Sequence, residues 1–315
     1  MALRDPKKPV APAMGPADGT NRDDAAVRDW DWSVLPDGSV RSRFAAPSGS
    51  LAMATMGKPQ NPRVVLVPGV TGSKEDFAIV MPDLAEAGMY VVSYDLAGQY
   101  ESAGAGPENL VPPRSHYDYE LFVNDFIAVL EDGSGPAHVV GYSFAALVAQ
   151  IAFTRRPELF RSLTLLSCPP DPGQSFRGVS RFGRFSRWAN GRVGAALMIW
   201  GIRRNFNNVT PSRLKFVRHR FRFTRRQSVR DIYELMKRAP DLRRVLAAAT
   251  LPKFVAVGEH DLWPLPLHQR FAESIGARIC VYRGGHSPSE TSPHEFARDL
   301  LALYAEAGQE GPHAG

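Results

Sequence analysis

Short runs of consecutive apolar residues alternate along the chain with longer segments in which apolar residues recur every three or four positions. A short apolar run is typical of a strand covered on both faces of a sheet, and the longer spacing is typical of a helix. Strands are expected over residues 39–45, 49–56, 63–67, 90–94, 137–140, 160–166, 254–257 and 278–282. Helices are expected over residues 75–85, 118–130, 147–153, 265–275 and 293–308.

The order of these elements indicates the fold class. The first two expected strands are separated by Pro47-Ser48-Gly49, which predicts an antiparallel hairpin. From residue 63 onward, strands and helices alternate with short connections. This alternation predicts an α/β fold with a mostly parallel sheet and helices on both of its faces.

One segment interrupts the alternation, because from about residue 176 to 246 the sequence is rich in arginine and aromatic residues and helical in pattern. We therefore expect the α/β core to be built from two pieces with a basic helical cap inserted between them. The N-terminal residues lack hydrophobic periodicity and predict a disordered tail. The expected parts are a tail over 1–30, the core over 31–170 and 251–308, the cap over 171–250 and a flexible C-terminal tail over 309–315.

Charge is distributed unevenly along the chain. Residues 171–250 hold 19 Lys and Arg but 4 Asp and Glu, a net charge of +15, so the rest of this +6 chain carries −9. The cap arginines could be solvated or paired with the acidic core, rest on anionic lipid, or bind an anionic substrate such as a carboxylate, a phosphate or a coenzyme A thioester. Nucleic acid is the least supported partner because no recognition motif accompanies the charge.

A candidate nucleophile lies where the strand ending near residue 140 meets the helix over 147–153. The connecting residues are Gly141-Tyr142-Ser143-Phe144-Ala145. A strand that reverses sharply into a helix needs small residues on both sides of the turn, and the residue at its tip is strained and exposed. Ser143 occupies that tip, although the turn alone also fits a plain buried serine.

A nucleophilic serine needs a base, normally histidine, and an acid that orients the base. Asp261 follows the expected strand over 254–257, and His286 follows the strand over 278–282. Because such side chains would lie at the carboxyl ends of parallel strands, they are expected on one edge of the sheet. Ser143, Asp261 and His286 are therefore the candidate triad.

Other residues near these strand ends have the same chemistry. Asp261 could instead cap the helix that follows it, and His286 could be a surface histidine. Glu259 or Asp171 could supply the acid, and His260 or His294 could supply the base.

The Gly-x-Ser-x-Ala turn and the order serine, aspartate, histidine resemble the α/β-hydrolase family. The resemblance covers about residues 39–308 apart from the cap. Three positions depart from the family pattern, because Ala145 and Tyr100 each replace a glycine and Pro68 stands where a histidine is common. The resemblance implies an α/β-hydrolase fold in which the backbone N–H groups of Val70 and Phe144 form an oxyanion hole.

The resemblance also implies the activity. It predicts a serine hydrolase that cleaves a small-molecule carboxylic ester or thioester through an acyl-enzyme on Ser143, without a cofactor or metal ion. Two alternatives remain, namely a carbon–carbon bond hydrolase with the same triad and a weakly active protein of this fold that binds a ligand or a membrane.

Composition points to the cytoplasm. The sequence has no apolar run of about 18 residues that could span a bilayer and no apolar signal-peptide core near Met1. Its two cysteines, Cys168 and Cys280, lie in apolar strand-like runs and are expected to be buried thiols rather than a disulfide or a metal pair.

Overall fold

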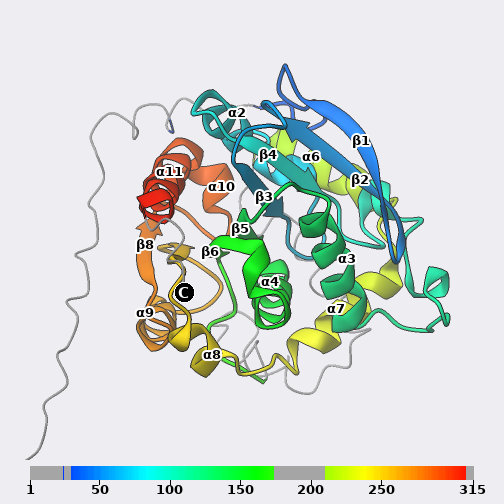
Figure 1. Ribbon diagram of the computed structural model, residues 1–315. Helices are drawn as coiled ribbons and strands as arrows, with labels where there is room; N and C mark the ends of the chain where they lie inside the picture. Colours follow the sequence, from blue (N-terminus) through cyan, green and yellow to red (C-terminus); the bar gives the residue numbers. More distant parts are fainter. Residues whose placement is uncertain (1–23, 25–29, 174–209, 310–315) are drawn as a thin grey trace, which may run out of the picture.

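The computed structural model describes Asp24, residues 30–173 and residues 210–309 (Figure 1). Within these ranges eight strands form one sheet in the order β1-β2-β4-β3-β5-β6-β7-β8. β2 is antiparallel to both of its neighbours, and every other pair is parallel, which confirms the mostly parallel sheet and the opening hairpin. The strands are β1 (Val40–Ala46), β2 (Gly49–Met56), β3 (Arg63–Val67), β4 (Tyr90–Tyr94), β5 (Ala137–Tyr142), β6 (Phe160–Leu166), β7 (Lys253–Gly258) and β8 (Arg278–Tyr282).

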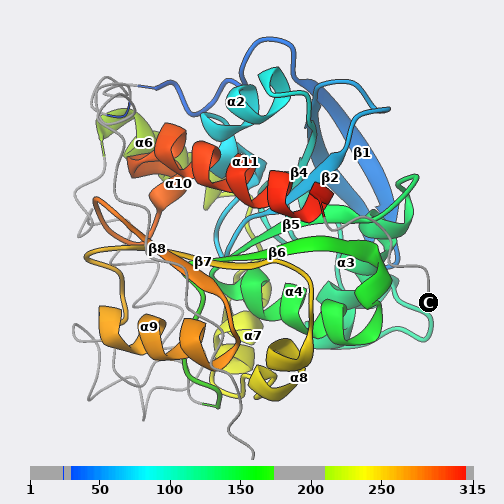
Figure 2. The ribbon, with the colours of Figure 1, turned by 60° about the vertical axis from the view of Figure 1, so that its left-hand side comes forward.

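Helices cover both faces of the sheet. Figure 2 shows α2, α10 and α11 on one side of the strands and α3, α4 and α9 on the other. The α-helices are α2 (Val80–Glu86), α3 (Tyr119–Glu131), α4 (Phe144–Arg155), α6 (Pro211–Arg220), α7 (Arg226–Met236), α8 (Arg243–Ala248), α9 (Leu265–Ser274), α10 (Pro288–Thr291) and α11 (Pro293–Gln309). The 3₁₀-helices are η1 (Lys74–Phe77), η2 (Tyr100–Ser102), η3 (Pro107–Asn109) and η4 (Pro157–Leu159).

The central strand β3 shows why its sequence is continuously apolar. Val65 and Val67 belong to the core under α3 and α4, whereas Val64 and Leu66 belong to the core under α2 and α11. All four side chains are buried because successive strand residues point to opposite faces and both faces are covered.

The helix expected over residues 75–85 is divided in two. η1 ends at Phe77, and α2 begins at Val80, so Pro82 falls in the first turn of α2. Proline lacks an N–H group and is tolerated there, but in a helix running unbroken from residue 75 it would clash with the preceding turn.

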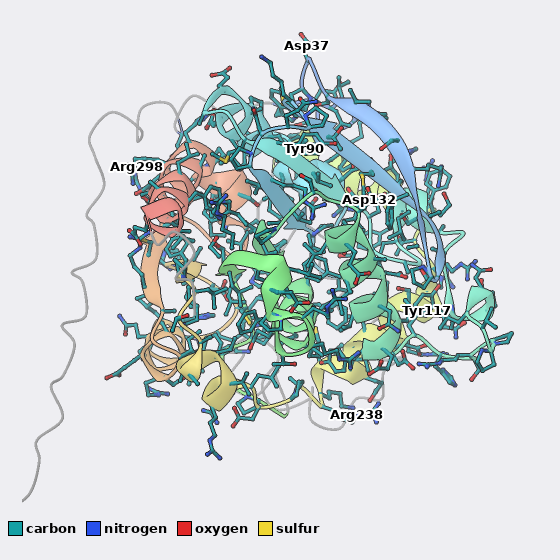
Figure 3. All side chains as sticks on the ribbon, in the orientation of Figure 1. Asp37, Tyr90, Tyr117, Asp132, Arg238 and Arg298 are labelled. Carbon is teal, nitrogen blue, oxygen red and sulfur yellow. The ribbon has the colours of Figure 1, made fainter. Side chains whose placement is uncertain are left out.

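Residues 171–250, the segment expected to form the cap, are called the inserted segment below. Its described part, residues 171–173 and 210–250, packs onto the core. α7 contributes Ile232, Leu235 and Met236 to the same apolar cluster as α3 and α4. Figure 3 shows Tyr117, just before α3, beside α7, and its N–H donates to the Asp231 carboxylate over 3.1 Å. Much of the arginine- and aromatic-rich segment over 176–246, namely residues 176–209, lies outside the described residues.

Two arginines of α6 are buried as ion-pair partners of the core. Arg213 and Arg220 donate to the same Asp76 carboxylate oxygen, over 2.7 and 2.6 Å. Arg213 also pairs with Glu290 of α10, and its guanidinium lies 4.2 Å from the centre of the Trp32 ring. Burial and ion pairing thus account for part of the basic charge in this segment, whereas Arg222 is exposed.

Both cysteines are buried and unpaired, as expected. None of the helices in the described ranges has the length and apolar character needed to cross a membrane.

A buried carboxyl on α3 is expected to make the stability of the protein depend on pH. Burial raises the pKa of Asp125 to about 7, although hydrogen bonds from the N–H and hydroxyl of Ser48 oppose that rise. Because the folded-state pKa lies above the unfolded value, this carboxyl stabilises the fold at low pH, and the contribution is lost as pH rises toward 7.

Asp125→Asn removes the charge and keeps a partner for both Ser48 groups, because the amide oxygen accepts from the Ser48 N–H and the amide nitrogen donates to the Ser48 hydroxyl oxygen. As pH rises from 5 to 8, the unfolding free energy of the variant should therefore rise by about 3 kcal/mol relative to that of the native protein. Urea unfolding at the two pH values measures this difference. The control Asp132→Asn removes an exposed carboxylate after the same helix and should leave the difference unchanged. An equal response of both variants would show that Asp125 is ionised throughout.

Candidate active site

Ser143 lies in a sharp turn between β5 and α4. Its backbone has φ +54° and ψ −114°, in a region that residues other than glycine rarely adopt. A Cβ on Gly141 would come within 2.7 Å of the Ala145 carbonyl oxygen and 2.8 Å of the Ala146 Cα. Because backbone atoms of the turn cannot yield, Gly141 is required, whereas Ala145 fits as a buried residue.

Three side chains from separate loops meet at this turn. The hydroxyl oxygen of Ser143 is 3.1 Å from Nε2 of His286, and Nδ1 of His286 is 3.0 Å from an Asp261 carboxylate oxygen. Both are hydrogen-bond distances. Asp261 follows β7 and His286 follows β8, so the parallel strands bring the predicted residues together at one edge of the sheet.

The environment of Asp261 keeps its carboxyl ionised. Burial alone raises the pKa of Asp261, but the nearby imidazoles of His286 and His268 outweigh that effect and hold it well below its usual range. An ionised carboxylate beside Nδ1 favours the tautomer in which Nδ1 carries the proton. Nε2 is then free to accept the proton of Ser143.

The competing histidines lie elsewhere. The side chain of His260 is 81% exposed and lies 3.8 Å from Glu259, and His294 pairs with Asp83 over 2.6 Å. His286 is thus the histidine in contact with Ser143.

The competing acids are also placed apart from His286. Glu259 lies near the N–H of Gly284, and Asp171 lines a pocket with Arg243. Asp261 is not the N-cap of the next helix, because Pro264 occupies that position.

The loop after β3 lies against the serine. A Cβ on Gly69 would come within 3.1 Å of Ser143 Cβ, so the next residue, Val70, is a close neighbour of the turn. Phe144 is the first residue of α4, and its N–H has no acceptor inside the helix. In the described part of the chain, no group accepts a hydrogen bond from the N–H of Val70 either. Both predicted donor groups therefore lie beside Ser143 without internal partners.

Two further residues near this site carry no recognisable sequence signal. His268 of α9 is fully buried, and its Nε2 lies 3.4 Å from the second carboxylate oxygen of Asp261. Gln99 is buried after β4 and accepts a hydrogen bond from the N–H of Thr71 over 3.0 Å. Gln99 lies in a loop after a strand and His268 lies on an ordinary amphipathic helix, so no sequence motif distinguishes either residue.

The chain belongs to the α/β-hydrolase family, whose family model matches residues 64–299. This agrees with the fold and with the resemblance of the serine turn to that family. A search of curated proteins gave no match.

Similar solved structures share this fold. A thermophilic esterase from Thermogutta terrifontis has 20% identity and a TM-score of 0.66, covering 85% of this chain and 99% of its own. A thioesterase domain from the curacin biosynthetic pathway has 16% identity and a TM-score of 0.64, covering 84% of this chain and 100% of its own. An epoxide hydrolase from Vigna radiata has 14% identity and a TM-score of 0.69, covering 87% of this chain and 100% of its own. Fold alone therefore does not identify the bond that is cleaved.

Proposed function

We propose that this protein is a serine hydrolase that cleaves a carboxylic ester or thioester through an acyl-enzyme on Ser143. The observation that carries the proposal is the continuous contact from Ser143 through His286 to Asp261, over 3.1 and 3.0 Å. An activated serine with a base and an orienting acid is the arrangement that acyl transfer requires.

The site residues divide the steps of the proposed reaction among them. Ser143 Oγ attacks the acyl carbonyl carbon while His286 Nε2 takes the hydroxyl proton, and the Asp261 carboxylate stabilises the protonated imidazole. The N–H groups of Val70 and Phe144 donate to the oxyanion of the tetrahedral intermediate. His286 returns its proton to the departing alcohol or thiol. A water molecule, deprotonated by His286, then releases the acid and restores Ser143.

The serine also separates this proposal from other reactions of the fold. Epoxide hydrolases and haloalkane dehalogenases use an aspartate as the nucleophile, whereas this turn carries Ser143. Carbon–carbon bond hydrolysis by the same triad is the closest rival, and ligand or membrane binding with slow hydrolysis is the second.

A panel of p-nitrophenyl acyl esters of increasing chain length tests the proposal. The native protein should release p-nitrophenolate from some members, with an optimum length that reflects the acyl pocket. Phenylmethylsulfonyl fluoride, which sulfonylates activated serines, should stop the release. Cleavage of a 1,5-diketone without any ester turnover would overturn the ester assignment, as would binding to anionic liposomes by a protein inactive on every ester.

A further inference from the structure

A chain of buried hydrogen bonds joins the loop after β3 to a helix of the inserted segment. The N–H of Thr71 donates to the side-chain oxygen of Gln99 over 3.0 Å. The side-chain nitrogen of Gln99 donates to the Ser228 hydroxyl of α7 over 2.6 Å. Ser228 in turn donates to the carbonyl of Ala97 over 3.1 Å. The side chains of Gln99 and Ser228 are fully buried, so no water competes for these bonds.

The loop that Gln99 holds has a strained backbone. Thr71 has φ +62°, which is costly for a β-branched residue. Such a conformation persists only when surrounding contacts fix it. Gly69 packs against Ser143 on one side of Val70, and the bond from Thr71 to Gln99 fixes the other side. The position of the Val70 N–H therefore depends on both anchors.

A second contact attaches the inserted segment to the end of the same loop. Arg220 of α6 donates to the Ser73 hydroxyl over 3.1 Å and to Asp76 of η1 over 2.6 Å. α6 thus contacts residues 73–76 directly, and α7 reaches Thr71 through Gln99. A displacement of α7 away from Gln99 would break the bond between Ser228 and Gln99.

From these contacts we infer that Gln99 is a positioning residue that couples the seating of α7 to the oxyanion donor at Val70. The inference rests on the proposed function, in which the Val70 N–H of the loop beside Ser143 donates to the oxyanion. With α7 seated, Gln99 holds Thr71 and keeps the Val70 N–H directed at the reacting carbonyl. Without that contact, the side-chain nitrogen of Gln99 loses its buried acceptor, the Ser228 hydroxyl, and the loop loses its outer anchor.

Methionine has nearly the length of glutamine without its polar atoms, so Gln99→Met removes both hydrogen bonds with little change of shape. We expect kcat for a p-nitrophenyl ester to fall about 10–100-fold with KM nearly unchanged, because a misplaced oxyanion donor weakens the transition state most. Affinity for an alkyl trifluoromethyl ketone, which forms a tetrahedral adduct with serine, should fall by a similar factor.

Two further variants locate the effect. Ser228→Ala breaks only the link to α7 and should lower kcat by a smaller factor, and it carries the test if Gln99→Met does not fold. Gln227→Met is the matched control, because Gln227 lies on the same helix and donates to the Ser115 carbonyl over 2.6 Å, away from the loop. This control should keep native kcat and inhibitor affinity, and thermal melting checks that each variant is folded.

Different results would overturn the coupling through Gln99 and the proposed function. An active native protein whose Gln99→Met and Ser228→Ala variants both match Gln227→Met in kcat and inhibitor affinity would overturn the inference and leave the proposed function intact. A native protein that neither hydrolyses the esters nor binds the trifluoromethyl ketone would overturn both.

Discussion

Replacing Ser143 with alanine is expected to lower kcat for ester hydrolysis on the order of 10⁶-fold, to the level set by the oxyanion donors and substrate binding. The substitution removes only the hydroxyl that contacts His286, so the fold should persist. A p-nitrophenyl ester assay with the native protein and Ser143→Ala measures the loss. Circular dichroism and thermal melting verify that the variant is folded.

Ser167 provides a matched control for that experiment. It also follows a strand, is fully buried and has a positive φ of +44°. Ser167→Ala therefore removes a hydroxyl from a comparable strained position that does not contact His286. Native activity is expected in this control. Activity retained by Ser143→Ala, or lost equally from both variants, would contradict the assignment of the nucleophile.

Asp261→Asn is expected to lower kcat by about 10⁴-fold. The amide keeps the size of the carboxylate, but its neutral side chain no longer favours the tautomer of His286 that accepts the proton of Ser143. It also no longer stabilises the protonated imidazole. Measuring kcat from pH 5 to pH 9 shows whether the loss holds over the whole range in which the native Asp261 carboxylate is ionised.

Glu259→Gln and Asp171→Asn are the controls for the acid, because both residues follow strands and have the same chemistry. Their positions beside Gly284 and in the pocket with Arg243 lead us to expect native turnover. A large loss in either control, together with an active Asp261→Asn variant, would mean that the hydrogen-bond chain to His286 has been assigned to the wrong carboxylate.

Local patterns, formed by residues close together in the sequence, were sufficient to predict most of the fold. The run Arg63–Val67 was predictable as a strand because both of its faces are covered, and the turn at Ser143 because Gly141 is sterically required there. Ser143, Asp261 and His286 follow β5, β7 and β8, and their order favoured them as the triad while other acids and histidines stayed open. The structure brings these three side chains into contact.

What could not be predicted depends on contacts between distant segments. Gln99 reaches Ser228, 129 positions away, and Arg213 reaches Asp76, 137 positions away. No hydrophobic periodicity or local sequence motif indicates such pairs. The total charge of the inserted segment likewise did not show that Arg213 and Arg220 are buried, since a charge count does not distinguish a paired arginine from an exposed one.

Ser143 is the residue that becomes acylated in the proposed reaction, and covalent labelling identifies that residue without a substrate. The native protein would be treated with an alkyl fluorophosphonate, which phosphonylates activated serines, digested and mapped by mass spectrometry. We predict one phosphonyl group per chain, on Ser143, and none in the Ser143→Ala variant. A fully labelled protein with its adduct on another residue, or an ester-hydrolysing protein left unlabelled at Ser143, would contradict the account.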